Sequence, residues 1–304
     1  MQARIKAIEG RAVTPARFYG WREYVELCKP RVIALMVFTS LVGMFLATPD
    51  FVSMEALVFG TIGIGFMAGA AAAINHLVDQ RIDGVMRRTM GRPLPTGRMD
   101  ASSALVFALL LGAIGLAVLA LLVNQLTALL TLLSLVGYSG VYTLYLKRAT
   151  PQNIVIGGAA GAMPPVLGWT AVTGQIDPHA LLLFLIIFAW TPPHFWALAI
   201  HRRSEYARAG VPMLPVTHGV AFTRLQILLY TIILVVVTLL PFATRMSGWL
   251  YLGGALLLNI GFLYYAFALY LRDNPKLPMK TFGYSILYLM GLFALLLLDH
   301  YLLI

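Results

Sequence analysis

The stretch NHLVDQRIDGVMRRTMGRPLPTG, residues 75–97, places an amide, two carboxylates and several arginines at the end of an almost entirely apolar segment. Asn75, Asp79 and Asp83 are spaced four residues apart, so on a continuous helix each lies only about 40° around from the last and all three share one face. The two prolines of RPLP should end the helix and leave a basic loop just outside the lipid core. The pattern predicts a membrane helix that ends in an oxygen-lined stripe.

The arginines after the stripe make it a candidate diphosphate site. Arg87, Arg88, Arg92 and Arg98 follow the two aspartates. Mg²⁺ prefers carboxylate and phosphate oxygens, and arginine pairs phosphate oxygens bidentately. These residues therefore predict a site for a magnesium-bound diphosphate. The alternative is a helix end with solvated charges, followed by a loop that only orients the protein in the membrane.

The composition is that of a polytopic membrane protein. Hydrophobic residues make up 60% of the chain, charged residues only 11%, and the mean hydropathy is +0.83, whereas about a quarter of a soluble domain is charged. The net charge of +10 reflects basic residues between membrane spans rather than nucleic-acid binding. A single cysteine, Cys28, excludes an intrachain disulfide.

Nine apolar runs are each long enough for a membrane-spanning helix. They lie near 32–48, 56–78, 102–123, 126–146, 152–172, 179–200, 222–243, 247–271 and 281–303. All 22 Lys and Arg residues except Arg245 then fall on one side of the membrane, which the positive-inside rule assigns to the cytoplasm. We predict an all-α bundle of nine transmembrane helices with a cytoplasmic N-terminus, a basic leader at 1–30 and a single transmembrane domain at 31–304.

Two segments on the same side could complete a substrate site. YTLYLKRATPQN, residues 142–153, carries Lys147 and Arg148, which could hold phosphate; the alternative is an interfacial belt of tyrosines and snorkelling lysines. GGAAGAMPPVLGW, residues 157–169, contains small residues and a proline pair, and a second proline pair precedes His194. These features suggest two spans that bend around one pocket, with tight helix packing as the alternative.

Histidines and a glutamate mark the segment from Thr191 to Pro215. His194 and His201 lie seven residues apart, near one helical face, and Glu205 follows one turn later. Ionisable groups inside membrane segments usually have a function, and imidazole is a common ligand of haem iron. For His194 the alternative is a core histidine that donates to a carbonyl freed by the prolines.

Together these motifs resemble the UbiA prenyltransferase superfamily. They are NxxxDxxxD at the end of span two, MxRTxxRPLPTG at 86–97, YTxYLKRxTPxN at 142–153, and PHFWALA followed by EYxxAGVPMLP. The resemblance covers about residues 28–300. The first motif is shared by the whole superfamily, whereas the block from His194 to Pro215 points to the branch that farnesylates haem.

The resemblance implies roles for individual residues. Asn75, Asp79 and Asp83 would bind Mg²⁺ and diphosphate, and His194 would contact haem. The implied phosphate contacts are Arg88, Arg92, Lys147 and Arg148. Further candidates for binding haem or orienting the substrate are Tyr142, Asn153, Arg203 and Tyr206.

The chain departs from the family pattern at two positions. Arg81 and Glu205 stand where many relatives have aspartates, and the loop after span six reads RRSEY where other members carry a second DxxxD. Glutamate can still donate oxygens, so Glu205 is a further candidate metal ligand.

The resemblance implies a bacterial inner-membrane enzyme whose site faces the cytoplasm. It would use Mg²⁺ to transfer the farnesyl group of farnesyl diphosphate to a vinyl group of haem b, giving haem O. Haem A synthase or terminal oxidase assembly factors would be possible partners. The alternatives are a prenyltransferase acting on an aromatic or quinone precursor, a carrier or channel, and a structural haem-binding subunit.

Overall fold

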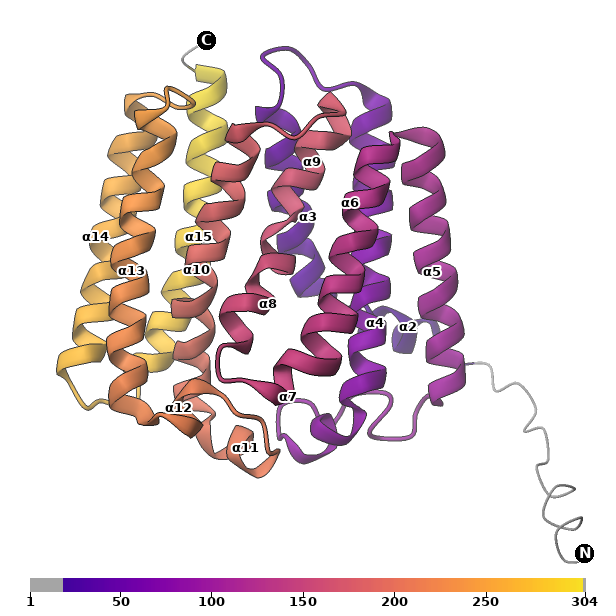
Figure 1. Ribbon diagram of the computed structural model, residues 1–304, viewed down its shortest axis with the longest axis vertical. Coiled ribbons are helices and arrows are strands. Elements are labelled where there is room, and N and C mark those ends of the chain that lie inside the picture. Colours follow the sequence, from indigo (N-terminus) through magenta and orange to yellow (C-terminus); the bar gives the residue numbers. More distant parts are fainter. Residues whose placement is uncertain (1–18, 303–304) are drawn as a thin grey trace, which may run out of the picture.

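Helices form all the regular secondary structure in residues 19–302, the part of the chain that the computed structural model describes, and no strand occurs among them (Figure 1). The first half contains α2 (Trp21–Leu27), α3 (Pro30–Leu46), η1 (Ala56–Gly60), α4 (Thr61–Val85), α5 (Ala101–Leu122), α6 (Gln125–Val136), η2 (Gly137–Leu146) and α7 (Lys147–Ala149). The second half contains α8 (Asn153–Ala162), α9 (Pro164–Thr173), α10 (Pro178–His201), α11 (Arg203–Arg208), α12 (Leu214–Thr217), α13 (Gly219–Ala243), α14 (Trp249–Leu271) and α15 (Leu277–Leu302). The predicted all-α fold is confirmed, and most of the predicted leader, residues 1–18, lies outside the described residues.

Within residues 19–302, eight helical segments are long and apolar enough to cross a membrane. A ninth candidate is the pair α2 and α3, which are bent by 57° relative to each other. Because α3 alone has 17 residues, the predicted number of nine spans is reached when this pair is counted as one. The side of the membrane on which each end lies stays a prediction.

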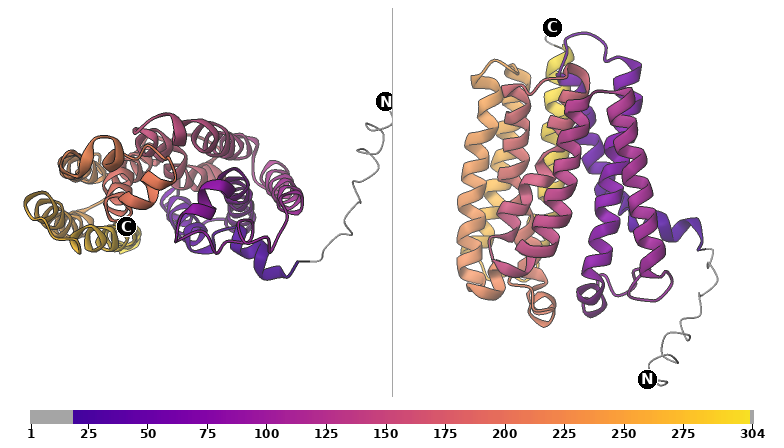
Figure 2. Two further views of the ribbon diagram at one scale, coloured as in Figure 1. Left: turned by 90° about the horizontal axis from the view of Figure 1, so that it is seen from below. Right: turned by 45° about the vertical axis from the view of Figure 1, so that its right-hand side comes forward.

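Six elements pack in a closed ring. α4 contacts η2, η2 contacts α8, α8 contacts α10, α10 contacts α15, α15 contacts α3, and α3 contacts α4. Figure 2 shows α13 to α15 on one side of the bundle and α4 and α5 on the other, with α8 to α10 between them. We call the end that carries α7, α11 and α12, at the bottom of Figure 1, the lower end. This end receives the polar motifs from both halves of the chain.

Glycines allow neighbouring helices of the bundle to pack closely. A Cβ on Gly43 would lie 2.2 Å from the carbonyl oxygen of Pro165, and a Cβ on Gly168 would lie 1.9 Å from that of Ser40. The backbones of α3 and α9 therefore touch, as small residues permit in membrane helices. In α8, a Cβ on Gly157 would lie 2.2 Å from the ring of Tyr142. The close packing that was the alternative interpretation of the glycine-rich block is thus present, and Gly157 lets η2 approach α8 closely.

The two proline pairs behave differently. Pro164 and Pro165 occupy the first turn of α9, and the helix before them ends at Ala162, as expected because proline suits a helix start and breaks a helix interior. Pro192 and Pro193 lie inside α10, which runs without interruption over 24 residues. A break therefore occurs at the first pair only.

Candidate functional site

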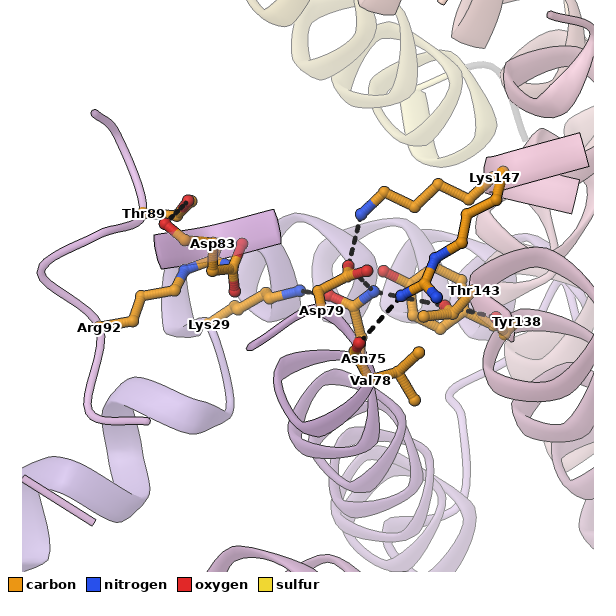
Figure 3. A network of polar contacts seen from close by, with 11 residues as sticks. Lys29, Asn75, Val78, Asp79, Asp83, Thr89, Arg92, Tyr138, Thr143 and Lys147 are labelled. Carbon is orange, nitrogen blue, oxygen red and sulfur yellow. Dashed lines mark hydrogen bonds and ion pairs between the residues drawn. The ribbon is translucent and has the colours of Figure 1, made fainter. Parts of the chain in front are cut away.

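The three oxygen-bearing side chains of the first motif share one buried face of α4, near its lower end (Figure 3). The exposed fractions are 4% for Asn75, 1% for Asp79 and 3% for Asp83. The helix ends at Val85, after the last aspartate, and the hydroxyl of Thr89 donates to the backbone oxygen of Asp83 (3.0 Å). The predicted stripe therefore exists and points into the protein rather than toward lipid.

Asp79 uses one carboxylate oxygen and leaves the other unpaired. Its Oδ2 accepts from Lys147 Nζ (2.5 Å) and from Asn75 Nδ2 (2.8 Å). Its Oδ1 is buried and has no hydrogen-bond partner within residues 19–302. A buried carboxylate oxygen without a partner is costly, and it is a ligand that Mg²⁺ would accept. The residues present therefore fit a hard divalent cation.

Asp83 pairs with the loop that follows it. Arg92 Nη1 lies 2.6 Å from Asp83 Oδ2, and both side chains are largely buried. The loop folds back by a series of turns, including the bond from Met99 N to the Pro93 oxygen (3.2 Å). The basic loop predicted from the prolines is thus ordered, and it returns Arg92 to the stripe.

Lys29 reaches the stripe from the start of α3. Its ammonium donates to Asn75 Oδ1, and its backbone adopts a left-handed conformation, with φ +52°. A non-glycine residue rarely adopts such a conformation, and strain of this kind concentrates at functional sites. Lys29 thus reaches the amide of the stripe, while Arg92 and Lys147 each pair with one of its two carboxylates (Figure 3).

The second predicted basic motif lies beside the first. Lys147 begins α7, directly after η2, and Arg148 Nη2 donates to the backbone oxygen of Val78 on α4 (3.1 Å). The hydroxyl of Thr143 accepts from Asn75 Nδ2 (3.3 Å). The structure thus joins the end of η2 to the stripe by both side-chain and backbone contacts.

Aromatic and amide groups continue from this point toward α8. The rings of Tyr138 and Tyr142 stack with centroids 5.5 Å apart. Asn153 is fully buried; its amide nitrogen donates to the Thr150 oxygen (2.7 Å), and its Oδ1 has no partner within the described part of the chain. Of the predicted substrate-orienting residues of this motif, Tyr142 therefore lies against Gly157 of α8 and Asn153 is the first residue of that helix.

Arg88, in the loop after α4, lies near α11. Its side chain is exposed, whereas Tyr206 on α11 is 3% exposed. Burial raises the pKa of the Tyr206 hydroxyl, and the cations of Arg88 and Arg202 act against that shift. Arg88 is therefore close enough to α11 for its charge to act on Tyr206.

Glu205 does not reach the stripe. Its Oε1 pairs with Arg202 Nη1 at 2.8 Å, and its buried Oε2 has no partner among residues 19–302. In the same residues no group of three or more His, Cys, Asp or Glu side chains is close enough to hold an ion. Arg203 is exposed. The role of Glu205 as a metal ligand stays a prediction, and in this arrangement the glutamate is held by its neighbouring arginine.

His194 lies on α10 in an aromatic sandwich. Its ring stacks on Trp190 (centroids 4.1 Å apart) and on Phe282 of α15 (4.5 Å). Its Nδ1 lies 2.7 Å from Ser285 Oγ. The partner of this nitrogen is a side-chain hydroxyl on another helix. His194 Nδ1 therefore does not donate to a backbone carbonyl freed by the prolines, which was the alternative interpretation.

The family of the chain follows from a comparison with protein-family models. The model described as the UbiA prenyltransferase family matches residues 36–296. The chain belongs to the UbiA prenyltransferase family. The match includes the stripe, the basic motif of η2 and α7, and the histidine segment of α10, so the parts gathered at the lower end are parts of the family domain.

Relatives of this UbiA-family chain carry a consistent name. A protein of Legionella pneumophila (strain Paris) named protoheme IX farnesyltransferase is 64% identical over 281 residues, which is 92% of this chain and 96% of the relative. One of Marinobacter nauticus with the same name is 62% identical over 297 residues, 98% of each chain.

Solved structures show the same fold at low identity. A structure concerned with digeranylgeranylglyceryl phosphate synthase superposes with a TM-score of 0.78 at 18% identity, covering 92% of this chain and 98% of that one. A UbiA homologue from Archaeoglobus fulgidus bound to DMAPP and Mg²⁺ has a TM-score of 0.61 at 19% identity, covering 90% and 99%. The predicted bundle is thus the UbiA fold.

Sequence reasoning missed one residue at the stripe of this UbiA-family chain. Lys29 was attributed only to the basic leader, although a lysine directly before Pro30, at the start of a span, is a signal that could have singled it out.

The cavity of about 610 Å³ at the upper end, lined by Phe242, Trp249 and His300 among others, offers no comparable site. Both oxygens of its carboxylate, Asp299, accept backbone N–H groups from the start of α14.

Proposed function

We propose that this chain transfers the farnesyl group of farnesyl diphosphate to a vinyl group of haem b, which gives haem O and diphosphate. The observation that carries the transferase chemistry is the buried, unpaired Oδ1 of Asp79 beside three cationic side chains. The choice of haem as acceptor rests on relatives that are 61–64% identical over most of the chain and are named protoheme IX farnesyltransferase.

The stripe and its cations would hold the diphosphate. Asp79 and Asp83, with Asn75, would provide oxygens to Mg²⁺, which when bound would offset the negative charge of the leaving diphosphate. Lys147 and Arg92, which now rest on the carboxylates, would turn to phosphate oxygens that enter between them. The exposed Arg88 and Arg148 would contact the outer phosphate. A UbiA homologue of the same fold that is bound to DMAPP and Mg²⁺ supports the binding of a diphosphate together with a metal ion.

The reaction would proceed between the stripe and α10. The bond from the allylic carbon to the diphosphate oxygen breaks, and positive charge develops on the allylic carbon while the cations stabilise the departing oxygen. A vinyl carbon of haem b attacks the allylic carbon. The cation left on the haem side chain captures water and releases a proton, which leaves a hydroxyethylfarnesyl group. The apolar helices would keep water from the first cation, and His194, with Tyr142, Asn153, Arg203 and Tyr206 as further candidates, would position haem.

We further propose that the lower end faces the bacterial cytoplasm, where the substrates would enter. All Lys and Arg residues except Arg245 belong to the side of the predicted topology that contains this end, and basic residues remain in the cytoplasm. The leader at 1–30 would precede a single domain at 31–304. Haem A synthase or oxidase assembly factors would receive the product.

Impermeant maleimide labelling is expected to show this orientation. In a Cys28→Ser background, Gly91→Cys at the lower end should react in inside-out vesicles and stay unlabelled in right-side-out vesicles. Phe51→Cys at the upper end, where the native side chain is 99% exposed, should give the reverse pattern. Labelling of Gly91→Cys from outside the cell would contradict the proposed orientation.

Purified protein incubated with haem b, farnesyl diphosphate and Mg²⁺ is expected to give haem whose mass has increased by that of one farnesol. The expected gain follows from adding a farnesyl group and a hydroxyl across one vinyl bond. Mass spectrometry of the extracted haem checks it, with a parallel reaction containing a chelator as the control. Prenylation of 4-hydroxybenzoate with unchanged haem would instead support a UbiA-type enzyme for an aromatic precursor.

A further inference from the structure

The hydrogen bonds around Ser285 determine which nitrogen of His194 carries a proton. Ser285 Oγ lies 2.7 Å from His194 Nδ1 and also 2.7 Å from the backbone oxygen of Phe282. A hydroxyl has one proton to donate, and a carbonyl oxygen can only accept. Both contacts are satisfied only if the hydroxyl donates to the carbonyl and Nδ1–H donates to the hydroxyl oxygen. A neutral imidazole then has a lone pair, and no proton, on Nε2.

The ring is also held in one orientation. Trp190 and Phe282 cover its two faces, with interplanar angles of 19° and 27°. The indole N–H of Trp190 donates to the backbone oxygen of Ser285 (2.8 Å), so the tryptophan is tied to the same residue of α15. Ser285 is fully buried, whereas His194 is only partly buried. Rotation of the imidazole would break the Ser285 bond and lose both stacking contacts.

The Nε2 atom has no competing partner. No hydrogen bond to it occurs within residues 19–302. The atom is also not fully buried, unlike the two ring nitrogens of His76, which are buried and have no partner among these residues. An oriented imidazole whose protonated nitrogen is fixed by a second residue is the usual arrangement of a metal-ligating histidine. α10 follows α8 in the ring, and α8 follows η2, so the ligand would lie across α8 from the stripe.

We propose that Ser285 is a positioning residue that holds His194 as the Nδ1–H tautomer, so that Nε2 can ligate the iron of the haem substrate. This inference rests on the proposed function, because it assumes that haem is bound. The backbone oxygen of Phe282 completes this chain of hydrogen bonds by accepting from the hydroxyl of Ser285. The iron ligand and its orienting residue thus come from two different helices, α10 and α15.

Haem titration of the detergent-purified protein tests the proposal. Ser285→Ala is expected to weaken haem b binding about tenfold, in line with the loss of partners behind metal-bound histidines, and to shift the absorption spectrum in the direction seen for His194→Ala. The matched control is Thr281→Val, which removes another fully buried hydroxyl of α15 that bonds only its own helix. Control and wild-type protein should bind haem alike. Unchanged binding and spectrum in Ser285→Ala would overturn the proposal.

A second measurement is independent of haem. In protein with ¹⁵N-labelled histidine, the signals lost in His194→Ala should be those of a ring protonated at Nδ1 and unprotonated at Nε2, and Ser285→Ala should alter them. A ring protonated at Nε2 in the wild type would overturn the proposal. If the wild type forms haem O but both variants bind haem normally, the proposed function stands and this inference fails; if no haem product forms, the proposed function itself fails.

Discussion

Asp79→Asn is expected to lower kcat/KM for farnesyl diphosphate by about 10³-fold or more, because it removes the negative charge that would hold the cation opposite the leaving diphosphate, an effect of several kcal/mol. Asparagine keeps the size of the side chain and an oxygen that can still accept from Lys147, which is now 2.5 Å away. The variant should therefore fold. The measurement is the initial rate of haem O formation at several Mg²⁺ concentrations, with thermal unfolding followed in parallel.

The matched control for this experiment is Asp50→Asn, which changes an exposed carboxylate at the upper end. It should keep the rate of the wild type. Asp83→Asn should act in the same direction as Asp79→Asn, because Asp83 lies on the same buried face and its partner Arg92 would lose the ion pair. Full haem O formation by Asp79→Asn in folded protein would exclude the proposed role of the stripe.

The spans and the stripe could be predicted because both depend on local sequence. A membrane helix needs a run of apolar residues, and the spacing of Asn75, Asp79 and Asp83 sets a shared face on any continuous helix. The position of Lys147 near the stripe could be predicted because it follows an apolar span on the same side. The structure places Lys147 beside Asp79, and its role as a phosphate contact stays a prediction.

The remaining parts depend on contacts between distant segments, which spacing does not reveal. Lys29 contacts Asn75 from the bend of 57° between α2 and α3. Pro30 marks the start of α3 in the sequence, but the angle of the bend and the contact across 46 residues do not follow from it. Ser285 stands 91 residues from His194, so their hydrogen bond could not be read from either motif. The ion pair of Glu205 is different, because its partner Arg202 is only three residues away; the role of Glu205 as a metal ligand stays a prediction.

Lys29→Met is expected to weaken the binding of a non-hydrolysable farnesyl diphosphate analogue about 30-fold at saturating Mg²⁺, the size of one charge-assisted hydrogen bond of about 2 kcal/mol. In the structure the ammonium donates to Asn75, and a diphosphate oxygen at that position would be a stronger, charged acceptor. Methionine keeps the unbranched shape and most of the length of the side chain and removes the charge. Isothermal calorimetry with the analogue measures the change, and Arg31→Met, an exposed cation two residues away, should leave the affinity unaltered.

The Lys29→Met variant also shows whether the ammonium contacts the diphosphate or only neutralises the stripe when Mg²⁺ is absent. If the ammonium of Lys29 only neutralised the stripe in the absence of Mg²⁺, its removal would leave two carboxylates opposed by fewer cations, so Mg²⁺ would bind more tightly and the analogue would bind unchanged. A ligand of the diphosphate must instead lose analogue affinity even when Mg²⁺ saturates the site. Because lysine and methionine are both unbranched, the left-handed backbone at position 29 costs them about the same, and the variant should retain the fold in which this difference can be measured.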